Sequence, residues 1–281
     1  MMKPFAVALV LLALPQAAHA QTFKSSAGDL KVETVVGGLV HPWALAFLSD
    51  GRMLVTERPG RLRIVTPDGK LSPPLGGVPK VYASGQGGLL DVAVDRNFAQ
   101  NRTIYLCYAD PMEGGARTSL ARAALGDGKL DDVKVIYRQE GPPSQGVHFG
   151  CRIVQTPDNL LFLTQGDHGS HSNQAQNLGN HIGKLIRITS DGAAPPDNPF
   201  VGRAGAKPEI WSYGHRNMQG AALHPTTGKL WEHEHGPRGG DEVNIPAKGK
   251  NYGWPVIGYG IDYSGAKIHD ATAKDLSLIH I

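Results

Sequence analysis

Short apolar or alternating segments recur along this chain, whereas amphipathic helical periodicity is nearly absent. Most of the segments are bounded by Gly, Pro, Asp or Asn, a pattern typical of β-strands joined by tight turns. The expected strands are Trp43–Phe47, Met53–Glu57, Leu62–Val65, Leu89–Val94, Thr103–Tyr108, Val133–Tyr137, Arg152–Gln155, Leu160–Thr164, Lys184–Ile188 and Ala221–Leu223. The sequence therefore predicts an all-β fold.

Two stretches share more than their turns. AFLSDGRMLVTERPG at 46–60 and VQTPDNLLFLTQGDHG at 154–169 each run from an apolar strand through a turn to a second apolar strand and a polar, Gly-containing loop. A diverged internal repeat of this kind favours sheets arranged radially, because a propeller brings equivalent polar loops to one central mouth. A sandwich and an open β-solenoid are the alternatives.

The N-terminus has the features of a secretory signal peptide over residues 1–20. Lys3 is followed by an apolar run from Phe5 to Leu14 and then by a small-x-small pattern, Ala18-His19-Ala20. The run is about half as long as a membrane-spanning helix needs to be. We therefore expect a periplasmic or secreted mature protein without a membrane span, whose single domain covers residues 21–281.

Charge and cysteine content exclude little. The chain has 28 basic and 25 acidic residues, a formal net charge of +3, and its Lys and Arg residues form no stripe or arm, so we expect no nucleic-acid partner. Cys107 and Cys151 both fall in apolar, strand-like segments. An oxidising compartment permits a disulfide between them, but buried free thiols are the favoured interpretation.

The stretch Trp231–Pro255, WEHEHGPRGGDEVNIPAKGKNYGWP, is too irregular in composition for a helix or a plain strand. A Gly-Pro pair beside acids leaves backbone carbonyls outside any ladder, and hard cations such as calcium prefer oxygen-rich loops. A metal or cofactor site is the first hypothesis, and a solvated connecting loop is the alternative. His233 and His235 alternate with Glu232 and Glu234, so the histidines should face one side and the acids the other; a zinc site there is disfavoured.

His148 and Asp167 form the candidate catalytic pair. His148 precedes an expected strand, and Asp167 follows the next one in Gly166-Asp167-His168-Gly169, so a hairpin would bring both to the same end of the sheet. A carboxylate beside an imidazole orients it as a general base. A structural role is the alternative for this pair, and solvation is the expectation for His168, His171 and His181.

Other polar residues lie in Gly-rich loops. Arg216 and Asn217 offer a planar cation beside an amide, which suits carbonyl or carboxylate recognition. Gln86, between Gly85 and Gly87, could hold a ligand with its amide or serve as a turn residue. For Arg216 the alternative is a loop arginine paired with an acid.

Several motifs in a fixed order resemble one known family. They are HFG at 148–150, GDHG at 166–169, GKLIRI at 183–188, DNPF at 197–200, EIWSYGHRNMQG at 209–220 and EHGPRGGDEVNIPAKGKNYGWP at 234–255. Together they resemble the soluble quinoprotein aldose sugar dehydrogenases of the glucose/sorbosone dehydrogenase family. The resemblance extends from about His41 to Gly265.

The resemblance implies a six-bladed β-propeller that binds pyrroloquinoline quinone (PQQ) and Ca²⁺ and oxidises the anomeric hydroxyl of aldose sugars to the lactone. It implies that His148 is the catalytic base and that Asp167 holds it. Gln86, Arg216 and Asn217 would contact the cofactor or its pocket. The carbonyls of Gly236 and Pro237 would bind the catalytic calcium, and Glu242 with the Tyr252 carbonyl a second, structural one.

Two departures from the family are visible. Cys151 stands where glycine is usual, and residues 276–281 do not resemble the family, whose members continue with strands that close the propeller. We therefore expect the sequence to be incomplete at its C-terminus and the chain to bind the quinone poorly. The expected partners are an aldose sugar and an electron acceptor that the sequence does not specify, in a monomer or homodimer. A calcium-dependent propeller lactonase and a non-catalytic propeller binding module are the alternative functions.

Overall fold

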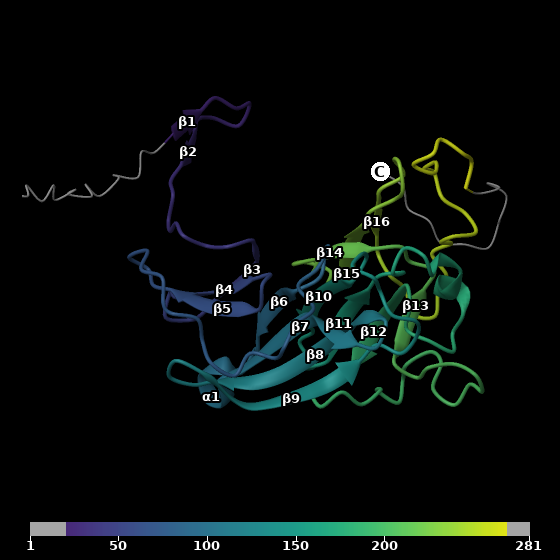
Figure 1. The fold of residues 1–281 in the computed structure, drawn as a ribbon, viewed down its shortest axis with the longest axis horizontal. Helices are drawn as coiled ribbons and strands as arrows, with labels where there is room; N and C mark the ends of the chain where they lie inside the picture. Colours follow the sequence, from purple (N-terminus) through teal and green to yellow (C-terminus); the bar gives the residue numbers. More distant parts are fainter. Residues whose placement is uncertain (1–20, 269–281) are drawn as a thin grey trace, which may run out of the picture. The chain divides into compact units, whose positions relative to one another are not determined.

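The structure is a computed structural model that describes residues 21–268 (Figure 1). The predicted signal peptide and residues 276–281 therefore lie outside the described residues. The chain divides into two units, Met1–Gly38 and Leu39–Ile281. In the first unit, β1 (Gln21–Phe23) pairs with β2 (Leu30–Val32) in an antiparallel hairpin.

The second unit contains four antiparallel sheets that follow one another along the chain. Each sheet consists of consecutive strands, which are joined to their neighbours by hairpins. The first sheet holds β3 (Pro42–Phe47), β4 (Met53–Glu57) and β5 (Arg61–Val65); the second β6 (Leu89–Val94), β7 (Thr103–Met112), β8 (Gly115–Leu125) and β9 (Leu130–Arg138); the third β10 (Gly150–Gln155), β11 (Leu161–Gln165), β12 (Lys184–Ile188) and β13 (Ile210–Tyr213); the fourth β14 (Met218–Leu223), β15 (Leu230–Glu234) and β16 (Glu242–Asn244).

The first strands of successive sheets contact one another. β3 lies against β6, β6 against β10, and β10 against β14, so these four strands line the inside of the array. The remaining strands of each sheet follow outward in chain order. This radial arrangement is that of propeller blades, and it confirms the prediction of an all-β propeller.

The sequence repeat corresponds to equivalent parts of two blades. Residues 46–60 contain the end of β3, the turn and all of β4, and residues 154–169 contain the end of β10, the turn and all of β11. These are the first two strands of the first and third sheets. Turn residues Gly51 and Asn159 have φ of 84° and 62°, the left-handed values that such tight turns require. The repeat thus places Arg58 and Asp167 at corresponding blade ends.

Several expected boundaries were wrong. The longest strand, β8 (Gly115–Leu125), was missed because its sequence GARTSLARAAL is rich in Ala and Arg, which have low strand propensity. The region Trp231–Pro255 is not a single irregular loop, because it contains most of β15 and all of β16. Within β15 the acids and histidines do alternate: Glu232 and Glu234 are buried, and His233 is exposed.

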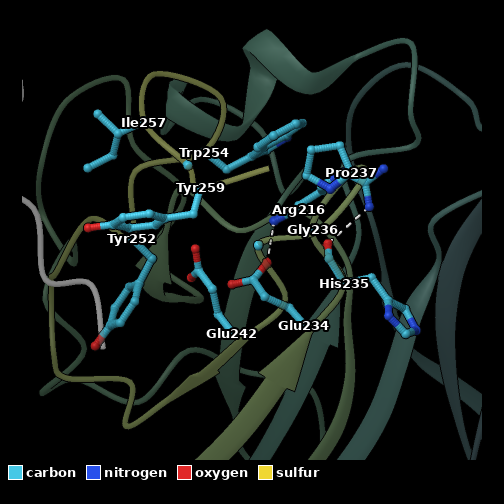
Figure 2. A pocket seen from close by; sticks show the side chains of 13 residues that line it. Arg216, Glu234, His235, Gly236, Pro237, Glu242, Tyr252, Trp254, Ile257 and Tyr259 are labelled. Atoms are coloured by element: carbon cyan, nitrogen blue, oxygen red, sulfur yellow. Dashed lines mark hydrogen bonds between the residues drawn. The ribbon is translucent and has the colours of Figure 1, made fainter. Parts of the chain in front are cut away.

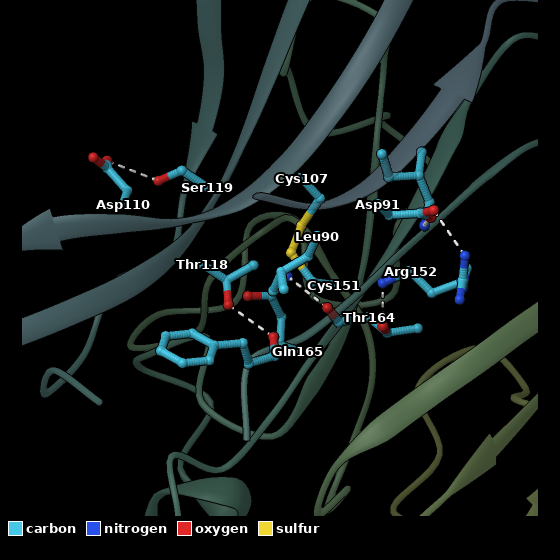
Figure 3. Close-up of a disulfide and its surroundings, with 12 residues drawn as sticks. Leu90, Asp91, Cys107, Asp110, Thr118, Ser119, Cys151, Arg152, Thr164 and Gln165 are labelled. Atoms are coloured by element: carbon cyan, nitrogen blue, oxygen red, sulfur yellow. Dashed lines mark hydrogen bonds and ion pairs between the residues drawn. A yellow bond between two sulfur atoms is a disulfide. The ribbon is translucent and has the colours of Figure 1, made fainter. Parts of the chain in front are cut away.

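Cys107 and Cys151 form a disulfide, so the expectation of free thiols was wrong (Figure 3). Both residues are fully buried in the same apolar cluster, as their strand-like surroundings indicated. Cys107 lies in β7 and Cys151 in β10, and the sequence could not show that the blade arrangement brings these strands together. Among the described residues, no helix is long and apolar enough to cross a membrane.

Candidate active site

His148 and Asp167 lie in direct contact at the start of β10 and the end of β11. The His148 Nδ1 is 2.6 Å from an Asp167 carboxylate oxygen, and the Asp167 side chain is buried. The other Asp167 oxygen accepts a hydrogen bond of 2.7 Å from the Trp254 indole N–H. A carboxylate at Nδ1 fixes the tautomer that leaves Nε2 with a free lone pair, which is the form that a general base requires.

The backbone of His148 is held by residues of the second blade. Gln86, in the loop before β6, accepts the His148 amide N–H at 2.8 Å through its side-chain oxygen. Thr118 of β8 donates its hydroxyl hydrogen to the Phe149 carbonyl at 2.7 Å. Gly166 allows the close approach from β11, because a Cβ there would lie 1.8 Å from the His148 carbonyl oxygen. Gln86 therefore positions the base.

Arg216 and Asn217 follow β13 and lead into β14. A buried Glu234 oxygen accepts the Arg216 and Asn217 amide N–H groups at 2.5 Å and 3.3 Å. The guanidinium donates to the His235 carbonyl at 3.0 Å and lies over the Trp254 ring, 5.3 Å from its centroid. The Arg216 Nε is buried and has no hydrogen-bond partner in the described part of the chain, which leaves a donor for an anionic ligand oxygen.

One cavity of about 320 Å³ is lined by both the candidate base, His148, and the Arg216 guanidinium. Its lining includes His148, Asp167, Arg216, Pro237 and Trp254. A second cavity of about 200 Å³ is lined by Gln86, Asn217, Phe149, Trp43, Arg58 and others. The structure therefore brings the predicted residues of four separate motifs to neighbouring cavities, whereas it places Asn217 beside the second cavity and not beside His148.

Gly236 and Pro237 lie in the turn after β15, on the wall of the pocket drawn in Figure 2. Their carbonyls accept no hydrogen bond from any residue between 21 and 268. Gly236 is required here, because a Cβ would lie 2.3 Å from the Gly239 carbonyl oxygen. Free carbonyls on a pocket wall are suitable ligands for a hard cation.

Glu242 and Tyr252 line the same pocket (Figure 2). Burial, reinforced by the nearby Glu234 carboxylate, raises the pKa of Glu242 to about 7. The Tyr252 hydroxyl donates to the Ile245 carbonyl at 3.0 Å, which anchors the backbone whose carbonyl was predicted to be a ligand. A bound divalent cation would offset the burial of the Glu242 carboxylate, so these residues fit a calcium site.

A buried polar cluster that the sequence did not predict lies beside the pocket. The His215 Nδ1 lies 2.9 Å from Glu234 and 3.9 Å from Glu232, and all three side chains are buried. His215 also stacks on Tyr252 at 4.7 Å between centroids. The signal in the sequence was the alternation in β15, which put both acids on one face without revealing that this face is the core.

Two histidines that were expected to be solvated are buried. His168 is 1% exposed, and burial lowers its pKa to about 4. Its Nδ1 lies 3.0 Å from the Pro142 carbonyl, which suits a neutral imidazole. His181 contacts the Glu140 amide and Glu209. The polar composition of their loop was misleading, because blade packing covers it.

The family model for Glucose / Sorbosone dehydrogenase matches residues 39–277. The chain belongs to this family. An aldose sugar dehydrogenase of Escherichia coli strain K12 is 49% identical over 249 residues, which are 87% of this chain and 67% of the relative. An uncharacterised protein of Synechocystis is 46% identical over 84% of this chain and 61% of its own length. Quinoprotein glucose dehydrogenase B of Acinetobacter calcoaceticus is 31% identical over 92% of this chain and 59% of its own length.

Solved structures agree with this membership of the glucose/sorbosone dehydrogenase family. A glucose dehydrogenase crystal structure matches with a TM-score of 0.83 at 51% identity, over 86% of this chain and 71% of that chain. The PQQ-bound aldose sugar dehydrogenase of Streptomyces coelicolor matches with a TM-score of 0.71 at 31% identity, over 91% of this chain and 72% of that chain. The chain thus spans about three fifths to two thirds of the length of the curated relatives described above.

Proposed function

We propose that this chain belongs to a quinoprotein that oxidises the anomeric hydroxyl of aldose sugars to the lactone. The observation that carries the proposal is the His148–Asp167 pair on a cavity whose wall also includes Arg216 and Pro237. The E. coli relative named an aldose sugar dehydrogenase and the PQQ-bound Streptomyces structure support the same chemistry. The predicted signal peptide supports a periplasmic or secreted location.

When bound, PQQ would supply the hydride acceptor for the sugar oxidation, and Ca²⁺ would supply Lewis-acid chemistry. His148 supplies the proton transfer. Its Nε2 would take the proton of the anomeric hydroxyl while Nδ1 stays hydrogen-bonded to Asp167. The buried Asp167 carboxylate would stabilise the imidazolium that results.

Arg216 would bind and stabilise negative charge on the cofactor. Its guanidinium is fixed by the His235 carbonyl and the Trp254 ring, so little reorganisation is needed when charge develops. Gln86 and Asn217, at the neighbouring cavity, would shape the cofactor and sugar pocket. The carbonyls of Gly236 and Pro237 would hold the catalytic Ca²⁺, and Glu242 with the Tyr252 carbonyl a structural one.

The decisive experiment adds PQQ and Ca²⁺ to the apoprotein and measures aldose-dependent reduction of an artificial electron acceptor. We expect activity that requires both additions, with PQQ in excess because weak quinone binding is expected. His148→Ala should lower kcat by about 10²- to 10⁴-fold and leave the quinone absorbance on the protein. His233→Ala is the matched control, because His233 is exposed and outside the cavity lining.

Two outcomes would contradict the proposal. Lactone hydrolysis without quinone would support a metal-dependent lactonase, and sugar binding without dye reduction would support a binding module. Normal turnover in His148→Ala would remove His148 from its role as base.

A further inference from the structure

The Cys107–Cys151 disulfide joins two blades immediately beside the candidate base. Cys107 lies in β7 of the second sheet, where it pairs with Leu120 of β8, and Cys151 lies in β10 of the third sheet. Figure 3 shows the bond, and both side chains are fully buried. Cys107 is therefore held in place by the second sheet, and the disulfide restrains the position of Cys151 and of the segment that begins at His148.

The backbone from His148 to Cys151 is held in an uncommon conformation. The φ angles of His148, Gly150 and Cys151 are 52°, 64° and 82°. The pairing of β10 with β11 also shifts register between Gly150 and Ile153. Such left-handed conformations suit glycine, and side chains adopt them only where the surroundings enforce them. Cys151 occupies a position suited to glycine, and its side chain makes the covalent bond.

The second blade holds this segment at successive points. Gln86 binds the His148 amide, Thr118 binds the Phe149 carbonyl, and Cys107 binds Cys151 covalently. In contrast, Asp167, which orients the imidazole, belongs to the third blade. The distance between His148 Nδ1 and the Asp167 carboxylate therefore depends on the contacts by which the second blade fixes the backbone from His148 to Cys151.

We propose that the Cys107–Cys151 disulfide is a positioning element for His148. It holds the left-handed segment so that Nδ1 stays in hydrogen-bond contact with Asp167. The catalytic consequence rests on the proposed function, but the positioning itself can be measured without cofactor or substrate.

The test compares two double variants that both lack the disulfide. Cys107→Ser with Cys151→Ser keeps a side chain at the left-handed position, whereas Cys107→Ala with Cys151→Gly puts the permissive residue there. The readout in the apoprotein is the downfield NMR resonance of the His148 Nδ1 proton, assigned by its loss in His148→Ala. We expect the serine pair to lose this resonance and the alanine-glycine pair to recover it.

Activity of the PQQ- and Ca²⁺-loaded protein should follow the same order. We expect kcat of the serine pair to fall by about tenfold to a hundredfold at nearly constant KM, because a small displacement of a reacting group is costly. The alanine-glycine pair should recover most of this loss. If the loaded wild type shows no dye reduction, the proposed function fails, while the resonance still decides the positioning.

A folded serine pair with the wild-type resonance would overturn the proposal. If the serine pair does not fold, wild-type protein reduced with dithiothreitol takes its place. Each disulfide reduced gives two thiols and consumes the two electrons of one dithiol, so a thiol titration verifies the reduction. An unchanged resonance in fully reduced, folded protein would overturn the proposal equally.

Discussion

The base segment, His148–Cys151 with Asp167, and the carbonyl loop, Glu234–Tyr252, both contribute to the wall of the 320 Å³ cavity but satisfy their polar groups in opposite ways. In the base segment, protein groups contact both Asp167 oxygens, and a disulfide ends the segment. In the carbonyl loop, the Gly236 and Pro237 carbonyls have no partner among the described residues, and the pKa of Glu242 is raised.

This difference separates two ways of building a site. Protein contacts alone preorganise the base, so its geometry should not depend on a ligand. The carbonyl loop places two carbonyls without a protein donor on the same pocket wall as the half-buried Glu242 carboxylate, a set of oxygen atoms that a bound cation would stabilise. Glu232, whose two buried oxygens have no hydrogen-bond partner between residues 21 and 268, extends this acidic character into the core beneath the loop.

Asp167→Asn should have the largest effect on kcat. An unchanged kcat would contradict the role of Asp167 in the base segment. The amide cannot stabilise the imidazolium, so we expect kcat to fall by about a thousandfold with PQQ still bound. Dye reduction and quinone absorbance measure the two quantities. Asp197→Asn, at an exposed carboxylate, is the control and should keep wild-type kcat.

Asp91→Asn tests the pH dependence of stability at a buried carboxylate of β6 that contacts Arg152 and Ile153, the residues that follow the base segment. Burial outweighs the 2.7 Å ion pair with Arg152 and raises the pKa of Asp91 to about 6 from 3.8. The folded protein then keeps a proton that the unfolded chain releases. The unfolding free energy of the wild type should therefore fall, relative to Asp91→Asn, by about 3 kcal/mol as pH rises from about 3 to about 7.

Urea denaturation at several pH values measures this difference. The exposed Asp158→Asn variant should follow the wild-type pH dependence. Parallel curves for wild type and Asp91→Asn would show that folding does not raise the pKa of Asp91.

Calcium removal tests the carbonyl loop and should have the smallest effect. At a free Ca²⁺ concentration about a hundred times Kd, binding should stabilise the folded protein by about 2.7 kcal/mol, and a chelator should abolish the gain. Glu242→Gln should lose this response, whereas the exposed Glu113→Gln should keep it. Thermal unfolding with and without Ca²⁺ provides the measurement. An equal response in both variants would contradict Glu242 as a ligand.

Local sequence signals predicted the strands of the inner hairpins well. Met53–Glu57, Leu89–Val94 and Lys184–Ile188 have the predicted bounds, because apolar runs between turn residues report strand formation directly. β8 was missed because its Ala and Arg residues are held in a strand by pairing with β7 and β9 on both sides. Pairing of this kind overrides intrinsic propensity.

The candidate pair His148 and Asp167 could be predicted because hairpin topology alone places both at one end of the sheet. The buried cluster of His215, Glu232 and Glu234 could not be, because a polar side chain in a strand gives no sign of which face is covered. For the same reason, the burial of His168 and His181 could not be predicted. Both were expected to be solvated, and both are buried.

Local sequence patterns were enough to predict the all-β class, the turn positions, the blade repeat and the chemical types gathered in the Gly-rich loops, since these depend on neighbours within a few residues. The disulfide between Cys107 and Cys151 and the contact of Gln86 with the His148 backbone follow from the packing of the blades. The same packing places Gly236, Pro237 and Glu242 on the wall of one pocket. These contacts join different blades or distant loops, and their geometry is set by how whole sheets pack.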